Sequence, residues 1–422
     1  MKVMNLSRRR ALQIGAAAGA LIAAPAYLHA APARIVIIGG GFGGAAAARA
    51  AKAQMPNAEV VLLSDQKRFW MCPGSNAVIA GMQDIGSIEV GYDAVIKRGI
   101  DVRFTRANAI DADKHHVMTA DGQTIRYDKL IMSPGVALNY SGIEGINEMT
   151  VDRVPHAWKA GPQTTLLADQ LATIPDGGLF VLSMPRAPYR CPPAPAERAC
   201  LVAHYLKHNK PGARLLILDA KDSFPFQDLF TEAWDTLYSD IIEYRAIADD
   251  GAVREVDPET LTAFTDFDEI KADVLNVIPP QTAGQIAIDA GATDDTGWCP
   301  IDIKTFESSL LKDVYVIGDS ALTEALPKAG STAASQARVA VNSAVADLTG
   351  TTAQRPSWIA NCYSQAAPDY GLRLGASYHL EDGHVVRNGT DFSVLGADAD
   401  TRESDARYAE VWLEQIKSEI WG

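Results

Sequence analysis

Runs of apolar residues mark the predicted buried strands of this chain. The first run, 35–38, leads directly into a glycine-rich turn and then an alanine-rich stretch at 45–51. Apolar runs without polar alternation are typical of parallel strands that helices cover on both faces. Further strands are predicted at 59–63, 125–135, 178–184, 213–218, 273–278 and 312–318. The pattern therefore predicts an α/β fold made of strand–helix–strand units.

The turn after the first strand has the spacing G-x-G-x-x-G, with its glycines at Gly39, Gly41 and Gly44. The first glycine permits the tight turn, the second lets the backbone approach a pyrophosphate, and the third lets helix and strand pack closely. The helix that follows would turn its positive N-terminal end toward the phosphates. The motif predicts a dinucleotide site, and a glycine turn without a nucleotide is the alternative at this point.

A second contact to the nucleotide is expected where the second strand ends. Dinucleotide-binding folds usually place an acidic residue there for the ribose hydroxyls. Ser64 occupies the expected position, and Asp65 comes next. Both side chains can accept a hydrogen bond from a hydroxyl, so the sequence leaves the choice between them open.

The second strand–helix–strand unit begins at 178–184, but its turn is different. The turn over 185–193 contains four prolines and no G-x-G-x-x-G. Proline lacks the backbone N–H that would hold a phosphate. We therefore expect no nicotinamide nucleotide in this part of the chain, and a different electron acceptor.

The strand at 312–318 completes the site that the opening motif begins. It ends in Gly318-Asp319, and a helix is predicted behind it at 332–348. This pattern resembles the way in which FAD enzymes of the glutathione reductase class hold the ribityl chain and phosphate, which implies that FAD is the cofactor. Lys328 precedes the helix, where a cation can stabilise an anionic reduced flavin.

These features predict a glutathione-reductase-like flavoprotein with two dinucleotide-binding-type domains and a C-terminal α+β interface domain. The FAD-binding domain is expected to be discontinuous, over 31–150 and 273–350. The second Rossmann-like domain is expected over 151–272 and carries Cys191. The C-terminal domain, 351–422, carries Cys362 and should contain short strands and a final helix.

The short strands of the C-terminal domain are expected at 372–380 and 384–387. In the final helix, apolar residues recur at helical spacing, namely Tyr408, Val411, Trp412, Ile416 and Ile420. A helix lying on a membrane and a helix docked on its own domain both fit this stripe. Because three glutamates outnumber Lys417 between 410 and 419, docking is expected.

Charge separates the N-terminal segment from the rest of the chain. The 422-residue chain has a formal net charge of −14, and residues 1–30 contain four basic residues and no acidic one, so the remainder carries −18. Such a charge argues against nucleic acid and anionic membranes as partners.

The N-terminal segment itself predicts export. Arg8, Arg9 and Arg10 precede an uncharged stretch at 11–26, which predicts a twin-arginine export signal over 1–30 and a location in the periplasm. A retained membrane anchor is the alternative. The apolar stretch is shorter than the roughly 18–20 residues of a membrane span, so no stable membrane insertion is expected.

The chain has five cysteines, Cys72, Cys191, Cys200, Cys299 and Cys362. In an oxidising compartment an odd number leaves at least one outside an internal disulfide. Cys191 is expected in the loop after a second-domain strand, where side chains reach over the flavin, and Glu197 near the start of the next helix could accept protons. A purely structural thiol at Cys191 fits the sequence equally well.

Two other cysteines have simpler interpretations. Cys200, His204 and His208 recur every four residues on one helix, a spacing that suits a metal ion. A solvated helical face is the simpler interpretation, and no metal site is predicted. Cys299 lies between Trp298 and Pro300 and is expected in the core.

Several separated segments carry a closer resemblance: 69–79, 188–193, 361–364, 367–371 and 419–422. In these segments the chain resembles the flavoprotein subunit of flavocytochrome c sulfide dehydrogenase. The resemblance implies that Cys72 carries FAD through a thioether to its 8α-methyl group. It also implies that Cys191 and Cys362 form a redox-active disulfide, with Glu197 as the acid near it.

The resemblance implies oxidation of sulfide to elemental sulfur or polysulfide, with electrons passing to a c-type cytochrome. The sequence has no C-x-x-C-H, so haem c would belong to a partner chain. A sulfide:quinone oxidoreductase shares the FAD core and the cysteine pair, but would need a quinone channel and membrane-binding C-terminal helices. A non-catalytic flavoprotein that activates a sulfur-oxidising complex would retain the same residues and is a further alternative.

Overall fold

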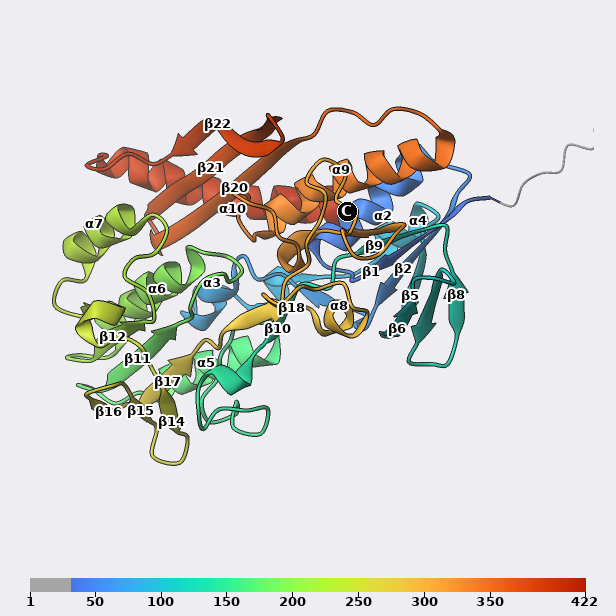
Figure 1. Cartoon of the computed structure of the whole chain (residues 1–422). Coiled ribbons are helices and arrows are strands. Elements are labelled where there is room, and N and C mark those ends of the chain that lie inside the picture. The colour runs from blue at the N-terminus through green and yellow to red at the C-terminus, as the bar shows by residue number, and fades with distance from the viewer. Residues whose placement is uncertain (1–31) are drawn as a thin grey trace, which may run out of the picture. The chain divides into compact units, whose positions relative to one another are not determined.

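The computed structural model describes residues 32–422, so the predicted export signal over 1–30 lies outside the described residues. The predicted apolar runs form two parallel sheets, and an antiparallel sheet follows them near the C-terminus (Figure 1). The predicted class, an α/β flavoprotein fold with two Rossmann-type domains and a C-terminal α+β domain, is confirmed.

The first sheet contains five parallel strands in the order β5-β2-β1-β9-β19. Taken in chain order this is 3-2-1-4-5, the arrangement of a dinucleotide-binding sheet. The strands are β1 (Arg34–Ile38), β2 (Glu59–Ser64), β5 (Asp101–Phe104), β9 (Lys129–Met132) and β19 (Val314–Val316). Ligands bind such sheets beyond the carboxyl ends of the strands, next to the point where the strand order reverses.

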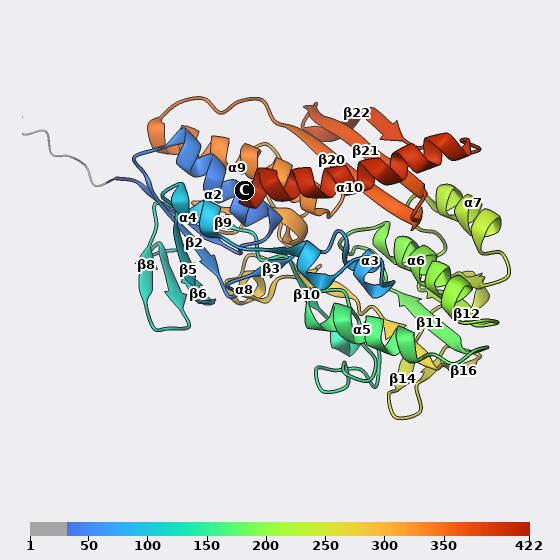
Figure 2. The same ribbon diagram turned by 180° about the vertical axis from the view of Figure 1, so that it is seen from behind.

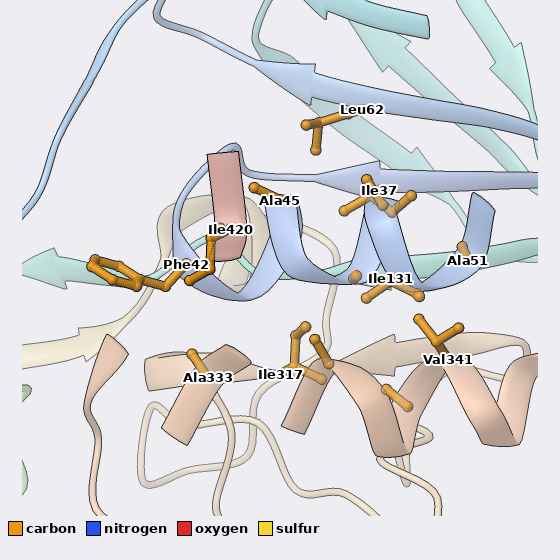
Figure 3. Packing of buried hydrophobic residues seen from close by; sticks show 14 of the residues in the cluster. Ile37, Phe42, Ala45, Ala51, Leu62, Ile131, Ile317, Ala333, Val341 and Ile420 are labelled. Atoms are coloured by element: carbon orange, nitrogen blue, oxygen red, sulfur yellow. The ribbon is translucent and has the colours of Figure 1, made fainter. Parts of the chain in front are cut away.

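Helix α2 (Phe42–Gln54) lies between this sheet and α9 (Gly330–Thr349). Figure 3 shows Ala45 of α2 in one buried cluster with Ile37 of β1 and Val341 of α9. The small residues of α2 allow this close packing: a Cβ atom on Gly44 would collide with the carbonyl oxygen of Gly39. The alanine-rich stretch is therefore a helix packed between the first sheet and α9.

The second sheet has four parallel strands in the order β13-β12-β11-β17. Its strands are β11 (Leu179–Met184), β12 (Arg214–Asp219), β13 (Ile242–Arg245) and β17 (Val274–Val277). The helices of this domain are α5 (Pro162–Thr173), α6 (Ala194–Asn209) and α7 (Gln227–Leu237). The predicted strand–helix–strand unit is present, with α6 starting directly after the proline-rich turn.

The predicted boundary at residue 273 is wrong by a few residues. Strand β17 pairs with β11 in the second sheet, so it does not begin the return to the first domain. The chain crosses back at β18 (Gln281–Ala283), which pairs antiparallel with β10 (Val136–Leu138). An apolar run alone does not show which of two sheets a strand joins, because both sheets offer it the same buried surroundings.

The predicted strand at 125–135 is divided between two sheets. Its first part, β8 (Thr124–Arg126), forms an antiparallel sheet with β6 (Ala107–Asp111) and β7 (His116–Thr119), and its second part is β9. The division falls at Tyr127-Asp128, where Asp128 Oδ2 accepts a hydrogen bond from the backbone N–H of Arg34 at 2.7 Å. This contact fastens the start of β9 beside β1.

Shorter elements complete the two domains. Strands β14 (Glu255–Asp257), β15 (Thr262–Phe264) and β16 (Glu269–Lys271) form a small antiparallel sheet, and β3 (Phe69–Trp70) pairs with β4 (Glu89–Val90). The short helices are α3 (Ser75–Ile79), α4 (Asp93–Lys97) and α8 (Gln285–Asp289). Helix α3 contacts α5 and α6, so the segment after Cys72 bridges the first and second domains.

The C-terminal domain is a three-stranded antiparallel sheet covered by one helix, as Figures 1 and 2 show. Its strands are β20 (Ser357–Ala367), β21 (Tyr370–Glu381) and β22 (His384–Phe392). The two strands predicted here are longer than expected, and β20 was not predicted because its sequence lacks regular apolar–polar alternation. This missed strand carries Cys362.

Helix α10 (Ala399–Trp421) is docked on the C-terminal sheet, as predicted. The buried stripe is shifted from the expected one: Ile416 and Ile420 are buried, but Tyr408 is 55% and Val411 63% exposed. Leu413 and Trp421 are buried in their place. Within the described part of the chain, no helix combines the length and apolar character needed to cross a bilayer.

Trp358 should contribute strongly to the stability of the C-terminal domain. The side chain is 1% exposed on β20 and its ring lies 6.1 Å from that of Phe306. Trp358→Ala should lower the free energy of unfolding by about 3–5 kcal/mol because it leaves a large buried cavity. Chemical denaturation measures this change, and the neighbouring Ile359→Ala, at a residue 47% exposed, should cost less than about 1 kcal/mol. Equal losses for the two variants would contradict the assigned packing.

Candidate functional site

Two adjoining cavities lie where the three parts of the molecule meet. With the open space at its mouth included, the larger, which we call the nucleotide cavity, spans about 1230 Å³, and the smaller, which we call the cysteine cavity, spans about 690 Å³. Cys72, Pro73 and Cys191 line both of them. These three residues therefore form the wall between the two cavities.

Most of the predicted site residues lie in these cavities. The nucleotide cavity is lined by Gly39, Gly41, Ser64, Asp65, Cys72, Cys191, Gly318, Asp319 and Lys328. The cysteine cavity is lined by Cys72, Cys191, Glu197 and Cys362. Gly44 lies outside both, because its role is the close approach of α2 to the turn before it.

The glycine turn makes a backbone cradle at the nucleotide cavity. Gly39 has φ +100°, and a Cβ atom there would collide with the carbonyl oxygen of Ser133. Only glycine fits this combination of a left-handed backbone and a close neighbour. Helices α2 and α9 both begin at this cavity, since Phe42 and Gly330 line it. Their positive N-terminal ends suit a pyrophosphate.

Ser64 and Asp65 differ in what they can still bind. Ser64 is 4% exposed, and its hydroxyl donates to the carbonyl oxygen of Gln66 at 2.8 Å and lies 3.2 Å from the Tyr92 hydroxyl. Asp65 is exposed and lines the cavity without a hydrogen-bond partner of its own among the described residues. The geometry therefore favours Asp65 as the acceptor for a ribose hydroxyl.

Asp319 has a buried carboxylate oxygen that faces no donor among the described residues. Its Oδ1 atom is buried, and no described residue hydrogen-bonds to it. Burial raises the pKa of this carboxyl above its ordinary value, against the opposing charges of Arg190 and Lys328. A buried acceptor of this kind requires a donor, and a hydroxyl of a ribityl chain would supply one.

Lys328 lines the nucleotide cavity, but its ammonium group is largely occupied. Nζ donates to the carbonyl oxygens of Asp319 at 2.7 Å and Ala321 at 2.8 Å, and lies 3.9 Å from the centre of the Trp298 ring. Burial lowers the pKa of Lys328 to about 8. The lysine thus supports the turn that carries Asp319, and contributes positive charge to the cavity beside Lys159 and Arg190.

These residues fit FAD. The glycine cradle, two helix N-termini and three cations suit a pyrophosphate, and Asp65 and Asp319 offer acceptors for hydroxyl groups. FAD is therefore the cofactor to which the nucleotide cavity is suited. The second domain contributes Arg190 and Cys191 to this cavity, not a phosphate-binding turn of its own.

The structure brings Cys191 and Cys362 together from distant parts of the sequence. Cys191 lies in the loop between β11 and α6, and Cys362 lies in the middle of β20. Both line the cysteine cavity and belong to the same cluster of apolar side chains. All five cysteines are free thiols in this structure.

The backbone at Cys191 is strained. Its φ is +54°, a left-handed conformation that is uncommon for a residue with a side chain and clusters at functional sites. Its N–H donates to the carbonyl oxygen of Lys328 at 2.6 Å, and its own carbonyl accepts from the N–H of Ala194 at 2.9 Å. These contacts fix the loop against the first domain and orient the Cys191 side chain toward the wall between the cavities.

The surroundings of Cys191 and Cys362 disfavour the thiolate form of both side chains. Burial raises the pKa of Cys191 well above its ordinary value, and the nearby Cys362 and Glu197 raise it further. Burial, and then the charge of Glu197, raise the pKa of Cys362 to about 12. The effect of Cys362 on the pKa of Cys191 follows from the proximity of the two sulfurs.

Cys72 lies at the wall that the two cavities share. Its Sγ atom lies 3.9 Å from the carbonyl oxygen of Trp158. Its own carbonyl accepts hydrogen bonds from the N–H and the hydroxyl of Ser75, at 3.0 and 2.7 Å. The bonds hold Cys72 directly before α3.

Glu197 is held by residues from two other parts of the chain. Its Oε2 accepts a hydrogen bond from Asn76 Nδ2 at 2.7 Å, and its Oε1 accepts one from the backbone N–H of Gln365 at 3.1 Å. Burial raises the pKa of Glu197 to about 6, although both hydrogen bonds and the charge of Arg198 oppose the rise. A carboxyl with this pKa can exchange protons near neutral pH.

Asn76 and Arg198 hold Glu197 from behind, and the sequence analysis assigned neither of them a role. Arg198 is 1% exposed, and its guanidinium donates to Asn76 Oδ1, Asn276 Oδ1 and the carbonyl oxygens of His156 and Ala157. Asn76 thus connects the buried cation to Glu197. The only available signal was position: Asn76 lies within the Cys72 segment and Arg198 follows Glu197.

The remaining cysteines are structural. Cys299 is completely buried beside Trp298, as predicted. The interpretation of Cys200 as part of a solvated face is wrong, because Cys200 is also completely buried and Trp234 Nε1 donates to its sulfur at 3.1 Å. Within residues 32–422, no three His, Cys, Asp or Glu side chains are arranged to hold a metal ion.

Three known families match separate parts of the chain. The family described as "Pyridine nucleotide-disulphide oxidoreductase" matches residues 33–164. The family described as "Sulfide dehydrogenase [flavocytochrome c] flavoprotein chain, central" matches residues 164–279, and "Flavocytochrome c sulphide dehydrogenase, flavin-binding" matches residues 354–421. The end of the central match at 279 agrees with the corrected domain boundary.

Individual relatives come from two kinds of protein. The mitochondrial sulfide:quinone oxidoreductase of Mus musculus is 24% identical over 306 residues, which cover 68% of this chain and 65% of that protein. The sulfide dehydrogenase [flavocytochrome c] flavoprotein chain of Chlorobaculum thiosulfatiphilum is 44% identical over 45 residues, which cover 11% of this chain and 94% of that sequence. The crystal structure of the sulfide:quinone oxidoreductase of Aquifex aeolicus is similar with a TM-score of 0.71 at 18% identity, over 92% of both chains. This structural likeness shows the fold.

Asn76→Ala should raise the pKa of Glu197. The variant removes a 2.7 Å hydrogen bond that stabilises the carboxylate, and such a bond to a charged group is worth about 1.5–3 kcal/mol. The pKa should therefore rise by roughly 1 unit or more above about 6. Infrared titration of the carboxyl C=O stretch, with Glu197→Gln as the subtraction reference, measures it. Gln83→Ala, at a residue that lines the same cavity, is the control; an unchanged pKa in Asn76→Ala would contradict the proposed contact.

Proposed function

We propose that this chain oxidises sulfide to elemental sulfur or polysulfide, because two of the families that match it are named for the flavoprotein of flavocytochrome c sulfide dehydrogenase and the mouse relative is named a sulfide:quinone oxidoreductase. Electrons pass from the substrate through a Cys191–Cys362 disulfide and FAD to a c-type cytochrome on another chain. One observation carries this proposal. Cys191 and Cys362 line one cavity, and Cys191 also lines the cavity that is suited to FAD.

The residues that would hold FAD are those of the nucleotide cavity. Gly39, Gly41 and the start of α2 face the pyrophosphate, Asp65 accepts from the ribose, and Gly318 and Asp319 accept from the ribityl chain. When bound, FAD supplies an acceptor for two electrons at once and can release them singly to haem. Cys72 is proposed to attach the flavin covalently, because it lies at the wall that both cavities share.

The chemistry of the chain's own residues is thiol–disulfide exchange. Hydrosulfide attacks one sulfur of the Cys191–Cys362 disulfide, which produces a persulfide on that cysteine and a thiolate on the other. Because both thiolates are disfavoured by burial, re-forming the disulfide is favourable once the electrons have left. Glu197 lies in the same cavity with a pKa of about 6 and accepts the proton of the incoming substrate.

A periplasmic location, which we also propose, would suit this chemistry. Cytosolic thiols would keep the cysteine pair reduced, whereas an oxidising compartment lets a disulfide persist. We propose that the segment over 1–30 directs twin-arginine export. The formal charge of −18 on the remainder would steer a basic face of a cytochrome toward it, with association rates that fall as salt rises.

A quinone is the alternative acceptor, because the mouse and Aquifex relatives are named as quinone oxidoreductases. Against it, two families matched by this chain are named for flavocytochrome c. Sulfide-dependent reduction of cytochrome c and of a soluble quinone by the purified protein separates the two. Quinone reduction without cytochrome reduction would overturn the cytochrome assignment, and no turnover with either acceptor would favour a non-catalytic flavoprotein that activates a sulfur-oxidising complex.

Cys72→Ser should release the flavin. If Cys72 forms the thioether, denatured wild-type protein keeps its yellow colour and its mass exceeds that of the chain by one FAD. The variant should lose both properties, while Cys200→Ala, at a buried cysteine outside the cavities, should keep them. Intact-mass measurement after acid precipitation shows whether the flavin is covalently attached. Free flavin in the wild-type supernatant would refute the covalent link.

Cys362→Ser should abolish sulfide oxidation while FAD stays bound. Without one sulfur the disulfide cannot form, so the rate of sulfide-dependent flavin reduction should fall by at least ~10³-fold, which corresponds to about 4 kcal/mol of activation free energy. The flavin absorbance spectrum checks cofactor retention. Cys200→Ala serves again as the control and should turn over normally. Activity near the wild-type level in Cys362→Ser would remove Cys362 from the mechanism.

A further inference from the structure

The two cavities on either side of Cys191 differ in charge. Lys159, Arg190 and Lys328 line the nucleotide cavity, which suits an anionic cofactor. No Lys, Arg or His of the described chain lines the cysteine cavity. Its charged side chains are both acidic: Glu197 inside, and the exposed Glu410 of α10.

Backbone donors for an anion are also scarce in the cysteine cavity. Helix α6 starts there, since Pro193, Ala194 and Glu197 line it, and a helix N-terminus is ordinarily a good anion site. Prolines at 192, 193 and 195 carry no N–H. The N–H of Ala194 donates to the carbonyl of Cys191, and that of Glu197 to the carbonyl of Pro193. The helix end therefore has few donors left for an anionic substrate.

The nearest cation, Arg198, does not make the cysteine cavity attractive to an anion. Arg198 is 1% exposed and does not line the cavity. Each of its three guanidinium nitrogens donates to a neutral oxygen of the protein. Its positive charge stabilises the carboxylate of Glu197, leaving Glu410 as the uncompensated charge at the cavity.

We propose that sulfide enters the cysteine cavity as neutral dihydrogen sulfide, not as the hydrosulfide anion, and that Glu197 removes its first proton inside the cavity. This inference rests on the proposed function and specifies which form of the substrate the site takes. Moving an anion from water into a largely apolar cavity that contains carboxylates costs far more than moving a neutral molecule.

The step balances within the cavity. Dihydrogen sulfide gives one proton to the Glu197 carboxylate, and the remaining hydrosulfide attacks one sulfur of the Cys191–Cys362 disulfide. A sulfur–sulfur bond forms to the substrate, the bond between the cysteines breaks, and the other cysteine leaves as a thiolate. The negative charge of Glu197 is thus transferred to that thiolate, so the total charge in the cavity is unchanged.

Glu197 can act as this base near neutral pH, since its pKa of about 6 leaves it mostly ionised there. The titratable groups that face it come from every neighbouring element: Arg198 and Cys200 on α6, Cys191 before α6, Cys72 before α3, Cys362 on β20 and Glu410 on α10. Burial raises the pKa values of Cys191, Cys200 and Cys362, so these thiols are protonated or bonded to each other at neutral pH. With Cys72 in its proposed thioether, the pH profile near pH 6 should report Glu197.

The test is the pH dependence of flavin reduction by sulfide in the FAD-loaded full chain. Anaerobic stopped-flow mixing follows the loss of flavin absorbance and needs no external acceptor. The second-order rate constant for total sulfide should rise as Glu197 ionises near pH 6. It should then fall about tenfold per pH unit above the first ionisation of dihydrogen sulfide. Methanethiol ionises at higher pH than dihydrogen sulfide. If ionisation of the substrate causes the fall in the rate constant, the fall should begin at higher pH with methanethiol.

Glu410→Lys tests whether the acidic charge of the cysteine cavity is what excludes the hydrosulfide anion. Replacing the acid by a cation should admit hydrosulfide and raise the rate constant at high pH at least about threefold in low salt, and salt should screen this gain. Glu414→Lys makes the same charge change on α10 at an exposed residue outside the cavity and should leave the profile unchanged.

Three results would overturn the inference. The first is a rate constant that rises through the ionisation of sulfide and then levels off, which identifies the anion as the entering form. The second is a falling limb that stays in place with methanethiol, which assigns it to a protein group such as Lys328. The third is an equal response of Glu410→Lys and Glu414→Lys. Absence of flavin reduction at every pH would instead overturn the proposed function itself.

Discussion

The site depends on hydrogen bonds that join the start of α6 to the rest of the molecule. The N–H of Cys191 donates to the carbonyl of Lys328 in the first domain, while Glu197 accepts from Asn76 of α3 and from the backbone of Gln365 in β20. Each bond connects the second domain to a different segment. Because buried polar groups without partners are costly, these bonds fix how the three parts meet, and so place two cysteines in one cavity.

The same junction separates two electrostatic environments. On one side, helix N-termini and cations favour a phosphate-bearing cofactor. On the other, apolar and acidic residues surround the sulfur atoms and make a lone thiolate unfavourable. Cys72 and Cys191 lie between the two environments. A covalent or redox link through this wall, as proposed, would connect the substrate in one cavity to the cofactor in the other.

The C-terminal domain completes the site. Strand β20 brings Cys362, and α10 closes the cysteine cavity with Trp412, Leu413 and Glu410. The domain thus adds a second cavity to a general flavoprotein fold, and Glu410 adds to the acidic charge that Glu197 of α6 gives that cavity.

The sequence by itself determined the features that depend on residues close together in the chain. Apolar runs set the strands, the glycines from Gly39 to Gly44 set the turn after β1, and prolines removed backbone N–H groups from the turn before α6, since each of these effects acts within a few residues. Only the tertiary structure decided which sheet β17 joins and that β20 is a strand. It also decided that the Ser64 hydroxyl is engaged by Gln66 and Tyr92, and that Asn76 and Arg198 support Glu197. Those outcomes depend on contacts between residues far apart in the chain, and the burial that decides them exists only once the chain has folded.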